Sequence, residues 1–172
     1  RTYAAILEAD RQSAVAFERG SAMAQAFNHM IMPLASERDK RTQVRWGVAD
    51  FEHRFGRKPE GMWLPETAVC LDSLRALVDA GITFTVLSPR QARSVRKKGA
   101  TTATPVNEAT LDTRVPYKVD LGQGRSIAVF FYDGATSQAV AFERLLSNGE
   151  GFAHRLAAGF ATPETRAELV HI

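Results

Sequence analysis

The alternation of helix-like and strand-like segments between residues 36 and 87 limits the possible folds most strongly. Ser36 to Gly56 predicts a helix, because a capping Ser precedes it, a Gly ends it, and apolar residues fall on one stripe between them. Met62 to Leu64 and Ile82 to Leu87 predict short strands, the second of them buried on both faces, and residues 71 to 78 predict a helix between them. Short connections between such elements favour parallel strands in an α/β fold.

The remaining segments extend this pattern. Gly122-Gln123-Gly124 separates two strand-like runs, which predicts a hairpin inserted into the α/β order. The other predicted elements are a helix over 2–19, a short strand and loop over 22–34, a long loop over 90–112, helices over 137–146 and 150–160, a turn at 162–164 and the start of a strand at 168–172.

The composition is that of a soluble globular protein. The chain has 172 residues, 45% of them hydrophobic, and a net charge of +3. Cys70 is the single cysteine, so a disulfide scaffold and a cysteine-based zinc site are excluded. We expect no membrane segment, because no run of about 18 apolar residues occurs. No secretory signal opens the chain, which says little about the compartment of a longer parent, and the expected location is cytoplasmic. The absence of an initiator Met and the apolar ending at Ile172 predict a piece of a longer protein.

Polar residues that directly follow predicted strands are the candidates for chemistry. The carboxyl ends of parallel strands meet at one face of the fold, where active sites are built. Glu66, Ser88 and Asp133 occupy such positions. Glu66 and Asp133 are two carboxylates that could face one cleft, as glycoside hydrolysis requires, and an indole near Glu66, that of Trp63, could stack on a sugar ring.

Each of these residues also has a simpler structural interpretation. Glu66 could stabilise a helix N-terminus, and Asp133-Gly134 could form an ordinary turn. His29 lies in an apolar run, where a hydrogen-bonded core histidine is common. The four histidines share no metal-ligand spacing, so we expect no metal and no cofactor.

Five cationic residues between Arg90 and Lys98 raise a different possibility. This basic cluster could bind nucleic acid or another anionic partner, or it could be a solvated loop. No aromatic residue lies within it, which favours the solvated loop and no nucleic-acid partner. The cluster consists of Arg90, Arg93, Arg96, Lys97 and Lys98.

Several stretches resemble glycoside hydrolase family 57. They are Ala26-Phe27-Asn28-His29-Met30-Ile31-Met32-Pro33-Leu34, Arg38-Asp39-Lys40-Arg41-Thr42-Gln43-Val44, Phe55-Gly56-Arg57-Lys58-Pro59-Glu60-Gly61-Met62-Trp63-Leu64-Pro65-Glu66 and Ala80-Gly81-Ile82. The segment Trp63-Leu64-Pro65-Glu66 resembles the family's nucleophile motif. The likeness covers residues 21 to 160.

The resemblance implies an α-glucan-active retaining hydrolase or transglycosidase with an incomplete (β/α)7 barrel. Residues 1–172 would be a fragment of that one catalytic domain, with Glu66 as the nucleophile and His29, Trp63 and Asp133 near the substrate. The general-acid Asp would lie beyond Ile172, so the fragment alone would be inactive. The expected partner is an oligo- or polysaccharide. Hydrolysis, transfer and branching stay open, as does the oligomeric state, and a non-catalytic carbohydrate-binding relative is the alternative.

Overall fold

The computed structural model describes residues 1–160, which form a mixed α/β structure with five α-helices and small sheets and without a closed barrel. The predicted turn at 162–164 and strand at 168–172 lie outside the described residues. The chain divides into two compact units, and we describe each by itself. Unit 1 comprises Arg1–Thr85 and Val119–Ile127, and unit 2 comprises Val86–Lys118 and the chain from Ala128 onward. The prediction that all residues belong to one barrel domain stays a prediction.

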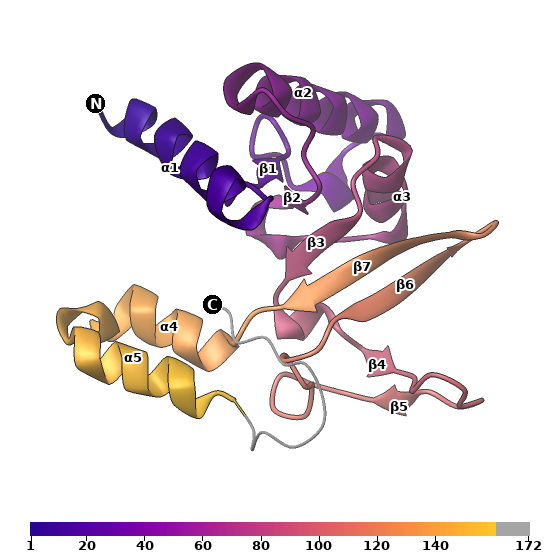
Figure 1. Ribbon diagram of the computed structural model, residues 1–172. Helices are drawn as coiled ribbons and strands as arrows, with labels where there is room; N and C mark the ends of the chain where they lie inside the picture. Colours follow the sequence, from indigo (N-terminus) through magenta and orange to yellow (C-terminus); the bar gives the residue numbers. More distant parts are fainter. Residues whose placement is uncertain (161–172) are drawn as a thin grey trace. The chain divides into compact units, whose positions relative to one another are not determined.

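Unit 1 contains α1 (Thr2–Phe17), β1 (Ala24–Gln25), α2 (Glu37–Phe55), β2 (Met62–Trp63) and α3 (Leu71–Asp79). The alternation over residues 36–87 predicts α2, β2 and α3, and the helix over 2–19 and short strand over 22–34 are the predicted forms of α1 and β1. Figure 1 shows β1 and β2 next to one another, close to α2. The two strands pair in parallel, and Gly61 forms a parallel bridge to Phe84 at the start of β3 (Phe84–Leu87).

The longest helix, α2, has the ends that its sequence specifies. The Ser36 side chain accepts a hydrogen bond from the Asp39 amide, and Gly56 ends the helix in the left-handed conformation with φ 66°. Its buried face differs from the predicted apolar stripe, because two polar residues belong to it. The buried residues are Lys40, Gln43, Val44, Gly47 and Phe51.

Strand β3 corrects one expectation. Its residues alternate between buried and half-exposed, so it is not buried on both faces. Thr85 and Leu87 point to the buried side, and the Thr85 hydroxyl donates to the Met62 carbonyl over 2.8 Å. The polar Thr85 takes a buried position and the apolar Phe84 and Val86 take half-exposed ones, so hydropathy does not reveal this alternation.

The hairpin prediction is confirmed. Strands β6 (Tyr117–Gly122) and β7 (Arg125–Phe131) are neighbours in the order β3-β7-β6, and only two residues join them. So short a connection requires an antiparallel pair.

The predicted loop over 90–112 is wrong in part. β4 (Ser94–Val95) and β5 (Thr104–Pro105) form a small antiparallel ladder within it. Beyond Pro105, the Val106 amide still donates across the ladder to the Arg93 carbonyl over 3.1 Å. The remaining elements of unit 2 are the helices α4 (Gly134–Phe142) and α5 (Gly149–Ala158). Helix α4 begins three residues earlier than predicted, because Asp133 caps it.

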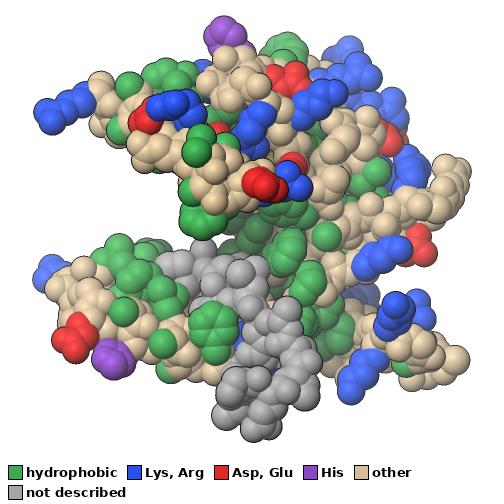
Figure 2. All heavy atoms as spheres, viewed as in Figure 1, with side chains coloured by type: hydrophobic (Ala, Val, Ile, Leu, Met, Phe, Trp, Pro, Cys, Tyr) green, Lys and Arg blue, Asp and Glu red, His purple; other side chains and the backbone are tan. Residues whose placement is uncertain are grey.

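The described part of the chain shows several apolar side chains at its surface. Figure 2 shows hydrophobic groups over the α4–α5 region, where Phe142 and Leu146 are exposed. Within residues 1–160, no helix is both long and apolar enough to cross a membrane.

One ion pair ties α1 to the turn that follows α2. Asp10 is 4% exposed and accepts two hydrogen bonds from the Arg57 guanidinium, at 2.7 and 3.1 Å. It also accepts one from the Ala22 amide at 2.7 Å. The Arg57 hydrogen bonds, against the opposing effect of burial, hold the pKa of Asp10 below its ordinary value of 3.8.

We expect Asp10→Asn to lower the free energy of unfolding at neutral pH by about 2 kcal/mol, the scale of hydrogen bonds to a charged group. Because the folded-state pKa is depressed, the ionised Asp10 stabilises the fold above the unfolded-state pKa. This contribution is lost as pH falls through the folded-state pKa. Denaturant unfolding from neutral pH down to pH 2 should therefore show the two proteins converging in acid. Glu8→Gln, at an exposed ion pair on the same helix, is the control and should change the unfolding midpoint much less.

Candidate active site

Glu66 lies just past the carboxyl end of β2, in the 3₁₀ turn Pro65–Thr67. Its backbone is left-handed, with φ 55° and ψ 18°, and Thr67 follows with φ 51°. Residues other than glycine rarely adopt this backbone conformation, least of all β-branched ones such as Thr. Where it occurs, it is found preferentially at functional sites. The neighbours Pro65 and Thr67 are buried, whereas the Glu66 side chain is 71% exposed. The turn therefore presents the carboxylate to solvent on a fixed backbone.

His29 lies past the carboxyl end of the neighbouring strand, β1. Its Nε2 atom lies 3.2 Å from Oε1 of Glu66, within hydrogen-bond distance. His29 also has a left-handed backbone, with φ 52°. A hydrogen-bonded core histidine, the simpler interpretation of the sequence, is wrong, because the His29 side chain is 60% exposed. The structure thus brings together two of the predicted site residues.

Gln43 on α2 holds the segment that leads to His29. Its side-chain oxygen accepts the Asn28 amide over 2.7 Å, and its backbone oxygen accepts the Phe27 amide over 3.3 Å. Gln43 is buried, at 4% exposure. No role was predicted for Gln43, although a polar residue on the inward face of an amphipathic helix is a signal that could have revealed one.

Trp63 is half-buried on β2 and pairs in register with Gln25 of β1. Its carbonyl accepts the Ala26 amide over 3.3 Å, so the residue helps to fix the ladder. Its predicted contact with substrate stays a prediction.

Asp133 lies directly after β7, in unit 2. Its two carboxylate oxygens accept the amide and the hydroxyl of Thr136, at 3.1 and 2.7 Å, so Asp133 caps α4. The simpler interpretation predicts an ordinary turn, and the structure instead makes Asp133 the cap of a helix that begins at Gly134. Whether Asp133 faces the same cleft as Glu66 stays a prediction. Ser88 similarly caps a short 3₁₀ turn.

The basic cluster is exposed throughout, on and around β4. Figure 2 shows Lys and Arg side chains over this part of unit 2. Arg90 pairs with Glu108 over 2.7 Å, and Arg96 donates to the Ala100 carbonyl over 2.9 Å. Binding of an anionic partner stays a prediction. Within residues 1–160, no group of three His, Cys, Asp or Glu side chains is placed to hold a metal ion.

The comparison with protein families shows which family the chain belongs to. The model described as glycosyl hydrolase family 57 matches residues 6–171. The chain belongs to glycosyl hydrolase family 57. This confirms the resemblance seen in the sequence. No curated protein is significantly similar to the chain in sequence.

Solved structures share the fold of this family member. An exo-type maltose-forming amylase from Pyrococcus sp. ST04 matches with a TM-score of 0.62 and 20% identity, over 94% of this chain and 26% of its own. A 4-α-glucanotransferase from Thermococcus litoralis matches with a TM-score of 0.57 and 18% identity, over 81% of this chain and 20% of its own. A family 57 branching enzyme from Thermococcus kodakaraensis, solved with glucose, matches with a TM-score of 0.53 and 22% identity, over 76% of this chain and 26% of its own. The chain thus spans a fifth to a quarter of these proteins.

The contact between Gln43 and Asn28 can be tested by hydrogen exchange. We expect Gln43→Leu to remove the acceptor and to raise the exchange rate of the Asn28 amide about five- to thirtyfold, as a local loss of 1–2 kcal/mol implies. Gln12→Leu, the same change at an exposed position of α1, should leave that amide unaffected. An Asn28 amide that exchanges at the same rate in Gln43→Leu as in the wild type would show that Gln43 does not hold this segment.

Proposed function

We propose that this chain is part of the catalytic domain of a retaining α-glucan hydrolase or transglycosidase in which Glu66 is the nucleophile. The observation that carries the proposal is the exposed Glu66 carboxylate, held on a left-handed backbone at a strand end beside His29. Membership of glycosyl hydrolase family 57 supports it, and so does the likeness to an amylase, a glucanotransferase and a branching enzyme. The corresponding fold would be a partial (β/α)7 barrel with an inserted hairpin, and the location cytoplasmic.

In this proposal Glu66 attacks the anomeric carbon of the glucan. A general acid protonates the leaving oxygen, and a covalent glycosyl-enzyme forms with inversion. Water or an acceptor sugar, deprotonated by the same acid residue, then displaces Glu66 with a second inversion, so configuration is retained. A nucleophile must be accessible to the substrate, and the exposure of Glu66 fits that requirement.

His29 and Trp63 would contribute to substrate binding. His29 Nε2 can donate to Glu66 Oε1 when that nitrogen carries a proton, which would orient the carboxylate. The indole of Trp63 offers an apolar face of the kind that sugar rings stack on. Asp133 would line the cleft, whereas the general acid would come from outside residues 1–172.

Replacement of Glu66 in the full-length protein tests the proposal. We expect Glu66→Gln to reduce glucan turnover on the order of a thousandfold or more, because the amide cannot act as the nucleophile. Glu60→Gln is the matched control, since Glu60 is an exposed carboxylate shortly before β2 that pairs with Arg19 over 3.4 Å. Unchanged turnover in Glu66→Gln would remove Glu66 from the mechanism. Glucan binding without turnover by the wild-type protein would instead favour the non-catalytic relative.

Chemical rescue distinguishes a nucleophile from other roles. Glu66→Gly is the suitable variant, because Gly adopts φ 55° without strain and leaves space for a small anion. With an activated glucosyl substrate, azide should bond to the anomeric carbon and displace the leaving group, giving a glucosyl azide of inverted configuration. Failure of azide to restore turnover in a folded Glu66→Gly protein would argue that Glu66 is not the nucleophile.

The proposal that the general acid comes from outside residues 1–172 leads to a separate expectation. Residues 1–172 on their own should be inactive or nearly so, because a retaining mechanism needs two carboxyl groups about 5 to 5.5 Å apart. Glucan turnover by this chain alone, lost in Asp133→Asn, would instead return Asp133 to candidacy as the acid.

A further inference from the structure

A polar cavity lies within unit 1, and neither Glu66 nor His29 lines it. Its volume is about 230 Å³, and its walls come from α2, α3 and the first residue of β7. Almost every lining residue carries a charge, with four cationic side chains against three carboxylates. A cavity of this composition has no evident role in packing the unit.

Lys40 brings a buried charge to this cavity. The residue is 6% exposed, and its ammonium group donates to the Ala35 carbonyl over 2.8 Å. Among the described residues, no carboxylate lies within ion-pair distance of it. An ammonium group has three hydrogens, so two remain without a protein acceptor. Buried charges are normally paired, which makes this group unusual.

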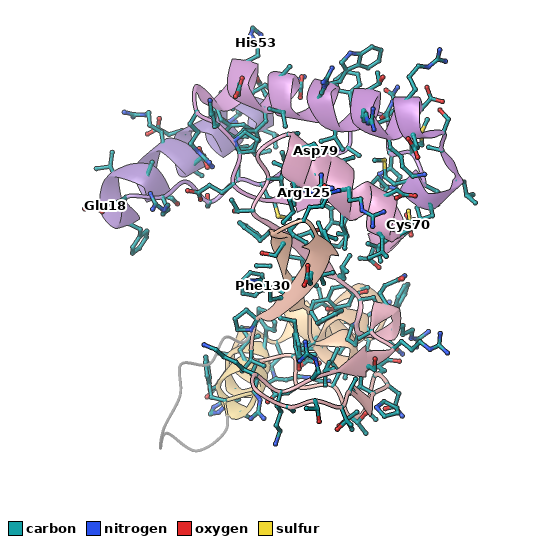
Figure 3. All side chains as sticks on the ribbon, turned by 90° about the vertical axis from the view of Figure 1, so that its right-hand side faces the viewer. Glu18, His53, Cys70, Asp79, Arg125 and Phe130 are labelled. Carbon is teal, nitrogen blue, oxygen red and sulfur yellow. The ribbon has the colours of Figure 1, made fainter. Side chains whose placement is uncertain are left out.

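Arg125 contributes a second unsatisfied donor. Its Nη1 atom donates to Asp79 Oδ1 over 2.8 Å, and Figure 3 shows the two residues next to one another. Its Nε atom is buried and has no hydrogen-bond partner within the described part of the chain. Among residues 1–160, it is the one buried side-chain nitrogen or oxygen atom that has no hydrogen-bond partner.

The remaining charges of the cavity largely neutralise one another. Arg75 pairs with Asp72 over 2.7 Å and Arg41 with Glu37 over 3.8 Å, both on the surface of a helix. The single excess positive charge therefore corresponds to Lys40, the cation without a carboxylate partner.

We propose that this cavity binds a phosphate group. The Lys40 ammonium, which has two hydrogens left to donate, and the unpartnered Arg125 Nε come from different elements, α2 and β7. A tetrahedral oxyanion can accept from both because its oxygens point in several directions. A planar carboxylate suits an intact guanidinium fork, which Asp79 already occupies in part. The cavity is smaller than the ~300 Å³ lower limit of typical small-molecule pockets, so it accepts a phosphate group with a few waters. Free phosphate and the phosphate of a sugar monoester share this chemistry.

Calorimetric titration of the full-length protein tests the proposal, with inorganic phosphate and glucose 1-phosphate as the two probes. Sodium chloride keeps the ionic strength constant, because screening alone alters charge-rich sites. We expect saturable binding, with affinity reduced about tenfold in Lys40→Met and in Arg125→Gln, the effect of losing one charge-assisted hydrogen bond. Arg45→Gln, an exposed cation of α2 that does not line the cavity, is the matched control and should bind as the wild type does.

The outcomes are distinct. Equal affinity for the two probes identifies the phosphate group itself as the ligand, and tighter binding of glucose 1-phosphate identifies the monoester. Absence of saturable binding, or unchanged affinity in both variants, overturns the proposal. If Lys40→Met fails to fold, Arg125→Gln decides, because the Arg125 side chain is 35% exposed and its replacement disturbs the core less. Glu66→Gln should bind phosphate normally, so this site and the proposed catalytic site can fail independently.

Discussion

Two backbone hydrogen bonds between β1 and β2 determine where the candidate site forms. The Ala24 amide donates to Gly61 over 3.2 Å and the Ala26 amide to Trp63 over 3.3 Å. Because the strands are parallel, their carboxyl ends lie at the same edge. Counted from the register pair Gln25 and Trp63, His29 lies four residues further along and Glu66 three, so both side chains follow shortly after the ladder and meet. A shift of one residue in this register would turn every side chain of one strand to the opposite face.

Helix α2 fixes that register through a close approach and a hydrogen bond. A Cβ atom at Gly47 would collide with the carbonyl of Gln25, so only Gly allows the helix to lie so near β1. One turn earlier on the same face, Gln43 accepts the Asn28 amide. The helix therefore contacts both the strand and the segment beyond it, and the position of His29 depends on two residues of α2 that take no part in the chemistry.

The sequence predicts the elements of unit 1 better than the contacts between them. Local signals specify α2, since Ser36 caps one end and Gly56 the other. The position of Glu66 at a strand end can be predicted without tertiary information, because a short apolar run and a Pro directly precede it. Its contact with His29 could not be predicted, because the ladder that aligns them has strands of only two residues. The β4–β5 ladder could not be predicted for a related reason. Ser, Thr and Pro are typical of loops, and only the pairing of the two segments makes these residues strands.

The left-handed backbone at Glu66 explains how the site reconciles two opposing demands. Pro65 and Thr67 are buried, and the carboxylate between them must reach solvent. An alternating strand could achieve this, but the Pro65–Thr67 segment has already turned into a 3₁₀ helix, with the Thr67 amide bonded to the Leu64 carbonyl over 2.9 Å. Positive φ values at Glu66 and Thr67 redirect the chain within that single turn. Each costs about 1–3 kcal/mol, which burial of Leu64 and its neighbours offsets at about 1.5–3 kcal/mol per large apolar side chain. Within this turn the strain lies at Glu66 and Thr67, and the buried residues beside them hold the backbone in that conformation.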